Sequence, residues 1–266
     1  MRRSLPLWSI LNAILIAVLA VAGMAVPAAA EPSPSRLWSV PLSGVLRVCT
    51  TGDYPPFTVR DAGGNYRGVD ISLATELATM LHAVPQWVPT TWTTLTQDFL
   101  AHCDIAVGGI SDTASRRAVA DVSVATVTDG KTPVTRRSSG DAYSSIDEID
   151  RPEVRVVVNP GGTNENFART HFPQAQIMVW PDNLTIYDQL SHGKADVFVT
   201  DSIEGLYRQR EYPDLQVLHP DKPFDSAAKV YLLPRGDTAF NGVVNAWLQV
   251  QISNGRTTAL LGDWLS

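Results

Sequence analysis

The sequence has little of the material from which metal, cofactor and nucleic-acid sites are built. Its two cysteines and five histidines are scattered, without the spacing of metal ligands. Its glycines form neither a phosphate-binding P-loop nor the G-x-G-x-x-G pattern of dinucleotide-binding proteins. A net charge of −6 and a pI near 5.3 argue against a nucleic-acid partner. We therefore expect no metal, no cofactor and no nucleic acid.

Low-complexity tracts and internal repeats are also absent from the sequence. Its 266 residues are 44% hydrophobic and 18% charged, as in an ordinary globular protein with room for two modest lobes. Lysine and arginine number 21 against 27 acidic residues. An acidic protein of this kind must gather cations locally if it binds an anion.

The first 30 residues have the pattern of an export signal. Two arginines precede an apolar run over residues 5–26, and three alanines at 28–30 form a cleavage pattern. Cleavage would remove these two arginines and no acid, so the net charge would go from −6 to −8. We predict a signal peptide at 1–30, a Pro- and Ser-rich linker at 31–43, and an exported protein, periplasmic or secreted. The apolar run is long, so an uncleaved anchor is the alternative, and this segment is the one membrane contact that we expect.

Export would place both cysteines in an oxidising compartment. Cys49 follows the strand-like run 45–48, and Cys103 precedes the strand-like run 105–107. A disulfide between neighbouring strands is the natural interpretation. A catalytic thiol is the weaker alternative, because no histidine has a spacing that suggests pairing.

Strand-like and helix-like segments alternate along the chain. Predicted strands cover residues 45–48, 85–88, 104–107, 154–158, 177–180, 197–200 and 229–233. Predicted helices begin at the N-caps Asp70 and Thr113 and also cover residues 94–102, 165–172, 184–192, 202–211 and 238–253. Such alternation gives parallel sheets covered by helices. Because the pattern restarts near Thr132, we predict two α/β lobes with a ligand cleft between them, near the carboxyl ends of the strands.

The stretch over residues 154–165 organises the rest of the chain. A β-branched run stops at Asn159-Pro160-Gly161-Gly162, and a helix follows with Thr163 or Asn164 as its N-cap. Strand, glycine loop and helix N-terminus together form a potential anion site, since free N–H groups and the helix dipole point at one spot. Glu165 adds a carboxylate beside that spot. On its own, it could simply complement the helix dipole.

The order of motifs resembles the type 2 periplasmic solute-binding fold of bacterial extracellular solute-binding family 3, and within it the exported cyclohexadienyl dehydratases. The residues that carry the resemblance are LRVCTTGDYPPF (46–57), TTW (90–92), CDIAVGGIS (103–111), DGKTPVTR (129–136), VNPGGTNENFA (158–168), KADVFVTD (194–201), HPDKPF (219–224) and YLLPRGD (231–237). DGKTP together with NPGGTNE is particular to the dehydratases. One departure is Ser123-Val124-Ala125-Thr126, where the family usually has Ser-Gln-Pro-Tyr, and a cleft contact is expected to be lost there.

The resemblance implies two lobes, 44–130 plus 227–266 and 131–226, with helix-covered, mixed but mostly parallel sheets. It also implies a lyase that removes carbon dioxide and a hydroxyl from prephenate or arogenate, which are small dianionic or amino-acid substrates. Such chemistry requires a general acid and cations that hold carboxylates.

Residues for these roles can be named from the matching motifs. Glu165 is the candidate general acid, and Arg116 and Lys131 are the candidate carboxylate-binding cations, with Lys131 also counted as catalytic. Tyr54 and Trp92 are expected to form the walls around the ring, unless they pack in a core. Asp201 could meet a ligand amine or cap the helix that follows it. The remaining expected contacts are Asp53, Gly109, Ser111, Asn159, Thr163 and Asn164.

A receptor that delivers an amino acid to an ABC transporter permease is the alternative from another class. It would share the fold, Arg116 and Asp201, but it has no need of Lys131 with Glu165. A sensor module held by an uncleaved N-terminal segment is a further, weaker alternative.

Overall fold

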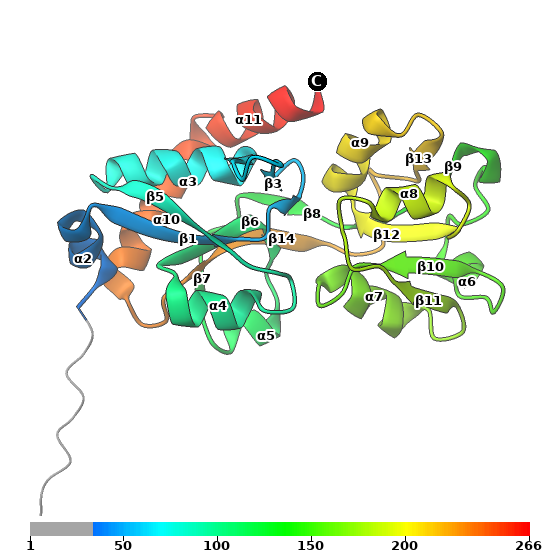
Figure 1. Cartoon of the computed structure of the whole chain (residues 1–266), viewed down its shortest axis with the longest axis horizontal. Helices are drawn as coiled ribbons and strands as arrows, with labels where there is room; N and C mark the ends of the chain where they lie inside the picture. Colours follow the sequence, from blue (N-terminus) through cyan, green and yellow to red (C-terminus); the bar gives the residue numbers. More distant parts are fainter. Residues whose placement is uncertain (1–33) are drawn as a thin grey trace, which may run out of the picture. The chain divides into compact units, whose positions relative to one another are not determined.

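The computed structural model describes residues 34–266, and residues from Ser35 onward form one compact unit (Figure 1). The predicted signal peptide, the alternative anchor run and the first residues of the predicted linker lie outside the described residues. Among residues 34–266, no helix is both long and apolar enough to cross a membrane.

The first lobe is built on a six-stranded sheet. Its strands lie in the order β5-β1-β6-β14-β7, and β8 pairs with β14. The strands are β1 (Val45–Thr50), β5 (Val84–Pro89), β6 (Ile105–Ser111), β7 (Asp121–Val122), β8 (Val127–Asp129) and β14 (Ala227–Leu233). Its helices are α2 (Arg36–Ser43), α3 (Val69–Met80), α4 (Leu95–His102), α5 (Ala114–Arg117), α10 (Thr238–Ser253) and α11 (Arg256–Leu265). A small three-stranded sheet, β2 (Asp53–Tyr54), β3 (Thr58–Arg60) and β4 (Tyr66–Arg67), adjoins it.

The second lobe is built on a five-stranded sheet in the order β11-β10-β12-β9-β13. Its strands are β9 (Lys131–Arg136), β10 (Arg155–Val158), β11 (Gln176–Val179), β12 (Val197–Asp201) and β13 (Leu215–Val217). Its helices are α6 (Ile146–Ile149), α7 (Thr163–His171), α8 (Ile186–Ser191) and α9 (Ser202–Glu211), with the 3-10 turn Arg137–Ser139 after β9.

Both sheets are mixed. In the first lobe β5, β1 and β6 run parallel and β14 runs antiparallel; in the second lobe β11, β10 and β12 run parallel and β9 runs antiparallel. The prediction of mostly parallel sheets is therefore correct only for three strands of each sheet. The chain enters each of the antiparallel strands β9 and β14 from the other lobe. Neither strand therefore follows a helix that packs on its own sheet.

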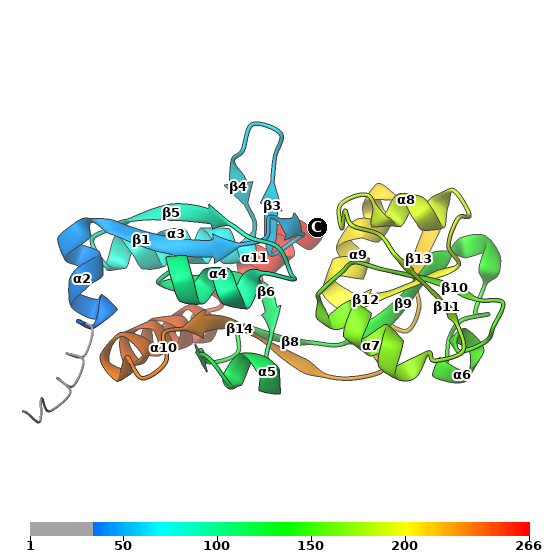
Figure 2. The ribbon, with the colours of Figure 1, turned by 60° about the horizontal axis from the view of Figure 1, so that its bottom comes forward.

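The chain crosses between the lobes twice, and the two crossings lie side by side (Figure 2). The first crossing passes through Gly130, between β8 and β9, and the second lies between β13 and β14. A Cβ on Gly130 would lie 2.1 Å from the carbonyl oxygen of Asp225, so only glycine permits this contact. The Lys131 N–H donates to Asp225 Oδ1 at 2.7 Å, which fixes the start of β9 against the returning chain.

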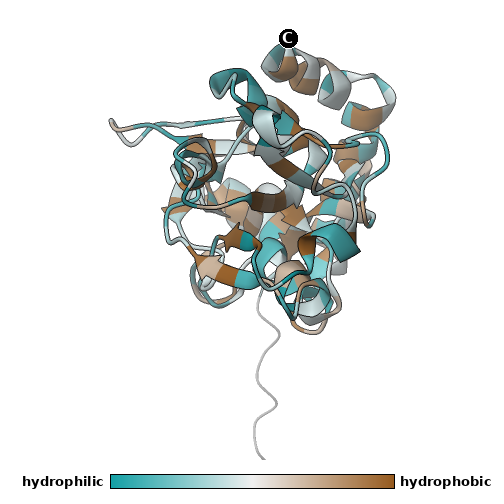
Figure 3. Cartoon of the chain, turned by 90° about the vertical axis from the view of Figure 1, so that its right-hand side faces the viewer, coloured by the Kyte–Doolittle hydropathy of each residue, from teal (hydrophilic) through white to brown (hydrophobic). Residues whose placement is uncertain are grey.

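Successive side chains of the buried strands point to opposite faces of each sheet. Each sheet therefore packs against helices on both faces. In β1, Leu46 and Val48 pack with α3 and α10, whereas Cys49 packs on the opposite face with α4. In β10, Val156 and Val158 pack with α7, whereas Val157 packs with α8. Figure 3 shows the hydrophobic colour concentrated in the central strands. The predicted cysteines form a disulfide, Cys49–Cys103, within the layer of α4.

Three local predictions were wrong. Residues 36–43 of the predicted linker form α2, whose Val40 is buried, and Asp237 accepts hydrogen bonds from Ser35 Oγ and the Arg36 N–H. Gly68, not Asp70, is the N-cap of α3. Gly162, not Thr163 or Asn164, is the N-cap of α7. In each case the expected capping or linker residues have partners far away in the sequence.

The Thr113 cap of α5 is confirmed, since its hydroxyl accepts from the Arg116 N–H.

Candidate active site

A small cavity lies between the two lobes at the carboxyl ends of the strands. Its volume is about 10 Å³, room for about one water molecule, so the lobes are closed on each other here. Residues of both lobes line it: Tyr54, Trp92, Gly109, Ser111, Asn159, Gly162, Thr163, Asn164 and Asp201. All of these except Gly162 were expected site residues. Asp53, Arg116, Lys131 and Glu165 are not among the lining residues, and each is placed below by its contacts.

Lys131 lies directly behind the cavity wall. As the first residue of β9 it is buried, and its Nζ donates to Asp201 Oδ1 (2.9 Å), Asn164 Oδ1 (2.6 Å) and Thr163 Oγ1 (3.1 Å). Asp201 ends β12, the strand paired with β9 in register at this position. The ammonium group thus holds the first turn of α7, and with it the floor of the cavity, against the sheet.

A second buried lysine, Lys229, reaches the same carboxylate from the other lobe. It lies in β14, has no exposed surface, and donates from Nζ to Asp201 Oδ2 (2.5 Å) and Ser111 Oγ (2.8 Å). The Tyr54 hydroxyl also donates to Asp201 Oδ2. Sequence reasoning missed Lys229. The available signal was one lysine inside the apolar strand Ala-Ala-Lys-Val-Tyr-Leu-Leu, where a charge needs a buried partner.

The two lysines control the charge of Asp201. Burial raises the pKa of Asp201, but the charges of Lys131 and Lys229 and the hydrogen bonds from Lys229 and Tyr54 outweigh it, so the pKa lies well below its usual range. Burial lowers the pKa of Lys229, more than the attraction of Asp201 raises it. Asp129 adds a second buried carboxyl group that interacts with Lys229 and Asp201, so the charges of the two lysines are shared between two carboxyl groups.

Arg116 adds a third cation at the first-lobe side. Its side chain is buried in α5, and Nη1 donates to the carbonyl oxygen of Ser111 at 2.6 Å. Burial lowers the pKa of Arg116 to about 10, so the guanidinium is still charged at neutral pH. Within residues 34–266 no carboxylate forms an ion pair with it, which leaves the rest of its fork for a ligand carboxylate.

Aromatic side chains close the first-lobe side of the cavity. Trp92 packs edge-on against Tyr54 with ring centroids 5.3 Å apart, and its Nε1 donates to Asp53 Oδ1 at 3.0 Å. The Asp53 carbonyl in turn accepts from Asn183 Nδ2 of the second lobe at 2.9 Å. Gly109, at φ +72°, leaves room for the Tyr54 ring, which a Cβ there would meet at 2.7 Å.

Glu165 follows the lining residues Thr163 and Asn164 in the first turn of α7 but does not line the cavity itself. Its Oε2 accepts from the Gly161 N–H at 2.8 Å, and its Oε1 from Arg169 Nε at 2.9 Å. The Gly161 hydrogen bond and the Arg169 charge lower the pKa of Glu165 against a smaller effect of burial. Gly161 itself touches Thr93 of the first lobe so closely that a Cβ would lie 2.3 Å from Thr93 Oγ1. Glu165 is therefore ionised, and it must turn away from Arg169 to reach the cavity.

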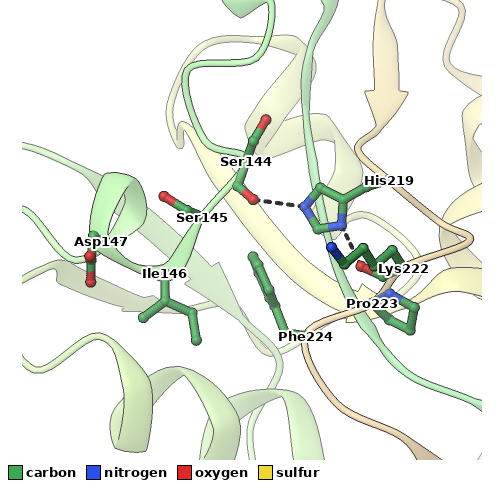
Figure 4. A pocket seen from close by; sticks show the side chains of 8 residues that line it. All are labelled: Ser144, Ser145, Ile146, Asp147, His219, Lys222, Pro223 and Phe224. Carbon is green, nitrogen blue, oxygen red and sulfur yellow. Dashed lines mark hydrogen bonds between the residues drawn. The ribbon is translucent and has the colours of Figure 1, made fainter.

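A larger hollow of about 500 Å³ lies elsewhere in the second lobe (Figure 4). His219 bridges two loops there, with Nε2 2.9 Å from the Ser144 carbonyl oxygen and Nδ1 2.9 Å from that of Lys222. The charged residues of this hollow, Asp147 and Lys222, are exposed. Solvent screens exposed charges, so we place the active site in the interlobe cleft, where the charges are buried.

Comparison with known proteins identifies the family to which the chain belongs. The pattern of bacterial extracellular solute-binding proteins, family 3, matches residues 46–266. The chain belongs to this family. It is 43% identical over 252 residues to the cyclohexadienyl dehydratase of Pseudomonas aeruginosa, covering 94% of each chain.

Two solved structures extend the comparison of this family-3 member. A crystal structure of an ancestral amino acid-binding protein, described as a precursor of cyclohexadienyl dehydratase, is 30% identical with a TM-score of 0.81 and covers 87% of this chain and 100% of its own. An ancestral cyclohexadienyl dehydratase is 44% identical with a TM-score of 0.55, covering 88% and 98%. Both agree with the type 2 periplasmic binding fold.

The departure from the family pattern at residues 123–126 affects a supporting segment of the site. Ser123 Oγ accepts from the Tyr231 N–H at 2.9 Å, and the Thr126 N–H donates to the Lys229 carbonyl oxygen at 2.8 Å. None of residues 123–126 is among those that line the cavity. Their place is beside β14, where they support the strand that carries Lys229.

In the part of the chain that the structure describes, no group of three histidine, cysteine or carboxylate side chains is arranged to hold a metal ion.

Proposed function

We propose that this protein is a cyclohexadienyl dehydratase, a lyase that converts prephenate to phenylpyruvate and, by the same chemistry, arogenate to phenylalanine. The observation that carries the proposal is the engagement of both oxygens of Asp201 by buried lysines, Lys131 and Lys229. Arg116, Lys131 and Lys229 are all buried near the cleft, although none of them lines the cavity in the closed form. The 43% identity to a curated cyclohexadienyl dehydratase supports the same conclusion.

The proposed reaction needs positioning and one proton. The bond from the prephenate ring to its carboxylate breaks and carbon dioxide leaves. The electron pair enters the ring, and the carbon–oxygen bond to the hydroxyl across the ring breaks. One proton joins the departing hydroxide to give water. Aromatisation of the ring supplies the driving force, so the protein has to hold two carboxylates and deliver the proton.

The residues of the cleft can be assigned to these tasks. Arg116 binds one carboxylate through its planar fork, and the lysines neutralise the other. Tyr54 and Trp92 enclose the ring. Glu165 delivers the proton after its side chain turns from Arg169 into the closed cleft, where desolvation and the dianion raise its pKa. Lys229 is the second candidate for the acid, because burial lowers the pKa of its ammonium group.

An amino-acid receptor is the second candidate function, since an ancestral relative is an amino acid-binding protein. In that alternative the carboxylate of Asp201 would pair with a ligand ammonium. Here both of its oxygens are already bound by lysines, so a ligand ammonium would have to displace one of them. The arrangement therefore favours prephenate over ligands that carry an ammonium group, arogenate included.

We further propose that the protein works after export, as the predicted signal peptide and the family's extracellular members imply. Its partner in that compartment is the small anionic substrate. A transporter permease is a partner only under the receptor alternative.

Ligand preference tests the proposed substrate class. Isothermal titration calorimetry should show binding of phenylpyruvate, the expected product, and no binding of L-arginine at comparable concentrations. The anion gains from the buried cations near the cleft, whereas the ammonium group of arginine would have to displace a lysine from Asp201. Tight binding of L-arginine with no binding of phenylpyruvate would favour the receptor.

A further inference from the structure

His219 does not line the interlobe cavity, yet both of its ring nitrogens are engaged (Figure 4). Nε2 lies 2.9 Å from the carbonyl oxygen of Ser144, and Nδ1 lies 2.9 Å from the carbonyl oxygen of Lys222. A carbonyl oxygen can only accept a hydrogen bond, and a neutral imidazole ring carries one N–H group. Only the protonated ring, the imidazolium, can therefore donate to both carbonyl oxygens at once.

The same two contacts fix the orientation of the His219 ring. A flipped ring would place carbon atoms 2.9 Å from the two carbonyl oxygens. C–H···O contacts in proteins have C···O distances of about 3.3–3.6 Å, so the flipped ring would lie too close. The backbone of His219 also has φ +36°, a conformation that is uncommon for residues other than glycine and persists only where the surroundings hold it.

Ser144 and Lys222 belong to different parts of the second lobe. Ser144 lies just before α6, whereas Lys222 lies in the segment of residues 218–225, where the chain begins its return to the first lobe. The imidazolium therefore ties the returning segment to the α6 side of the lobe.

The 218–225 segment also holds the backbone of Lys131, the lysine that contacts Asp201 behind the cavity wall. The Phe224 N–H donates to the Lys131 carbonyl oxygen at 2.7 Å, and Asp225 Oδ1 accepts from the Lys131 N–H at 2.7 Å. Both bonds depend on the course of the chain that follows Lys222. Loss of the contact between His219 and the Lys222 carbonyl oxygen would therefore loosen the first residue of β9.

Phe224 provides a second connection, from His219 to helix α7. Its ring packs edge-on against the His219 ring with centroids 5.1 Å apart, and it stacks on Phe167 of α7 with centroids 6.1 Å apart. The first turn of α7 carries two residues that line the cavity and accept from Lys131. His219 thus supports both the lysine and the helix turn that it binds.

The charge of the ring decides whether both contacts of His219 can form. Histidine side chains ordinarily change charge between about pH 5 and pH 8, and a ring that loses its second proton can keep only one of two such bonds. The other titratable groups on the elements around it are Asp221 and Lys222 on its own segment, Asp147 and Glu148 on α6, Lys131 on β9 and His171 on α7. Asp147 and Lys222 line the hollow beside the ring, and their charges are opposite.

We propose that His219 is a positioning residue that acts as an imidazolium: it clamps the 218–225 segment and thereby places Lys131 and the start of α7 for the substrate, so that substrate capture weakens as the ring loses its second proton. The proposal deepens the proposed dehydratase function and rests on it.

The test compares the KM for prephenate between pH 6 and pH 8 in the full-length parent, His219→Asn and His192→Asn, after subtraction of the protein-free rate. Asparagine tolerates a positive φ, so His219→Asn removes the ring without adding backbone strain. His192 is the matched control, because it is an exposed histidine of the same lobe with one ring nitrogen 2.9 Å from a carbonyl oxygen, that of Asp188.

In the parent and in His192→Asn, KM should rise about threefold or more from pH 6 to pH 8, within the contribution of one hydrogen bond. Because the clamp acts on binding, kcat should change by less than about twofold. In His219→Asn, KM should equal the parent's pH 8 value within about 1.5-fold at every pH, since the second bond is never formed. A KM in the parent that does not change with pH, or the same rise in His219→Asn, would overturn the proposal.

NMR of the ring nitrogens tests the clamp without any use of activity. Long-range ¹H–¹⁵N spectra of the parent should show the assigned His219 ring protonated on both nitrogens at pH 6 and on one nitrogen at pH 8. A neutral ring at pH 6 would refute the clamp even if the protein turns over prephenate.

A second variant keeps the kinetic test decisive if His219→Asn does not fold, which urea unfolding would reveal. Phe224→Leu keeps the N–H that donates to Lys131 but removes the ring between His219 and α7, so it should raise KM at pH 6. An unchanged KM in Phe224→Leu would contradict the proposal.

Absence of prephenate turnover in the parent would overturn the proposed function and leave the clamp to be tested on binding. The same pH comparison is then made on the Kd of phenylpyruvate. A loss of affinity from pH 6 to pH 8 that His219→Asn abolishes would support the clamp, and any other result would refute it.

Discussion

Replacement of Glu165 by glutamine should lower kcat for prephenate by about 10²–10⁴-fold, the usual contribution of a positioned general acid. Glutamine keeps the size of the side chain and can still accept from the Gly161 N–H, but it has no acidic proton to give to the leaving hydroxyl. Binding of phenylpyruvate, measured by calorimetry, should stay within a few-fold of the parent. The expected result is therefore loss of turnover without loss of binding.

Arg169→Gln is the matched control for this experiment. Both substitutions break the same i,i+4 ion pair between Glu165 and Arg169, which is exposed enough to contribute only about 0.3–0.5 kcal/mol to stability. Only Glu165→Gln removes the acid, so Arg169→Gln should keep kcat within a few-fold of the parent. If Glu165→Gln keeps the full kcat, then Glu165 only complements the dipole of α7, and Lys229 becomes the leading candidate for the proton donor.

Replacement of Arg116 by alanine should lower kcat/KM by the equivalent of about 2–5 kcal/mol, because a buried charged partner of a substrate carboxylate is lost. Arg116→Lys keeps the charge but cannot form two parallel hydrogen bonds, so it should recover only part of the loss. Steady-state kinetics with prephenate measures both effects.

The neighbouring residue provides the control. Arg117 is the next residue of α5, but its side chain is exposed and pairs with Asp112 at 2.5 Å. Arg117→Ala should change kcat/KM by less than about twofold, since exposed ion pairs contribute little. Equal losses in the Arg116 and Arg117 variants would show that the effect comes from damage to α5 and not from a substrate contact.

The residues of the site that could be predicted lie in motifs at strand ends and loops. Asn159, Thr163 and Asn164 follow a β-branched run that was interpreted as a buried strand, so their place at the carboxyl edge of the sheet could be predicted. The same reasoning placed Asp201 at the end of β12. The partners of these side chains could not be predicted from the sequence. Thr163 and Asn164 accept hydrogen bonds from Lys131 and do not cap α7.

Long-range partners account for what sequence reasoning missed. The Asp70 carboxylate accepts from the N–H groups of Gly108 and Gly109 and does not cap a helix, and burial raises its pKa to about 6. Lys229 and Glu204 look like single polar residues in ordinary elements until the folded chain brings Asp201 and Thr200 beside them. Periodicity predicts which face of an element is buried, but it does not reveal which buried charges face each other.

The secondary structure of residues 36–43 likewise depends on long-range contacts that the local sequence does not reveal. The chain at 36–43 has the proline and serine content of a linker, yet α2 forms there because its Val40 is buried against the core of the first lobe. Tertiary packing here outweighs local propensity.

The most direct test of the account is multiple turnover of prephenate by the purified protein. Prephenate in at least a hundredfold excess should be converted fully to phenylpyruvate, detected by its absorbance in alkali, with one carbon dioxide released per phenylpyruvate. Conversion no faster than in a protein-free control, or product limited to one equivalent of protein, would contradict the proposal that this family-3 cleft is the active site of a dehydratase.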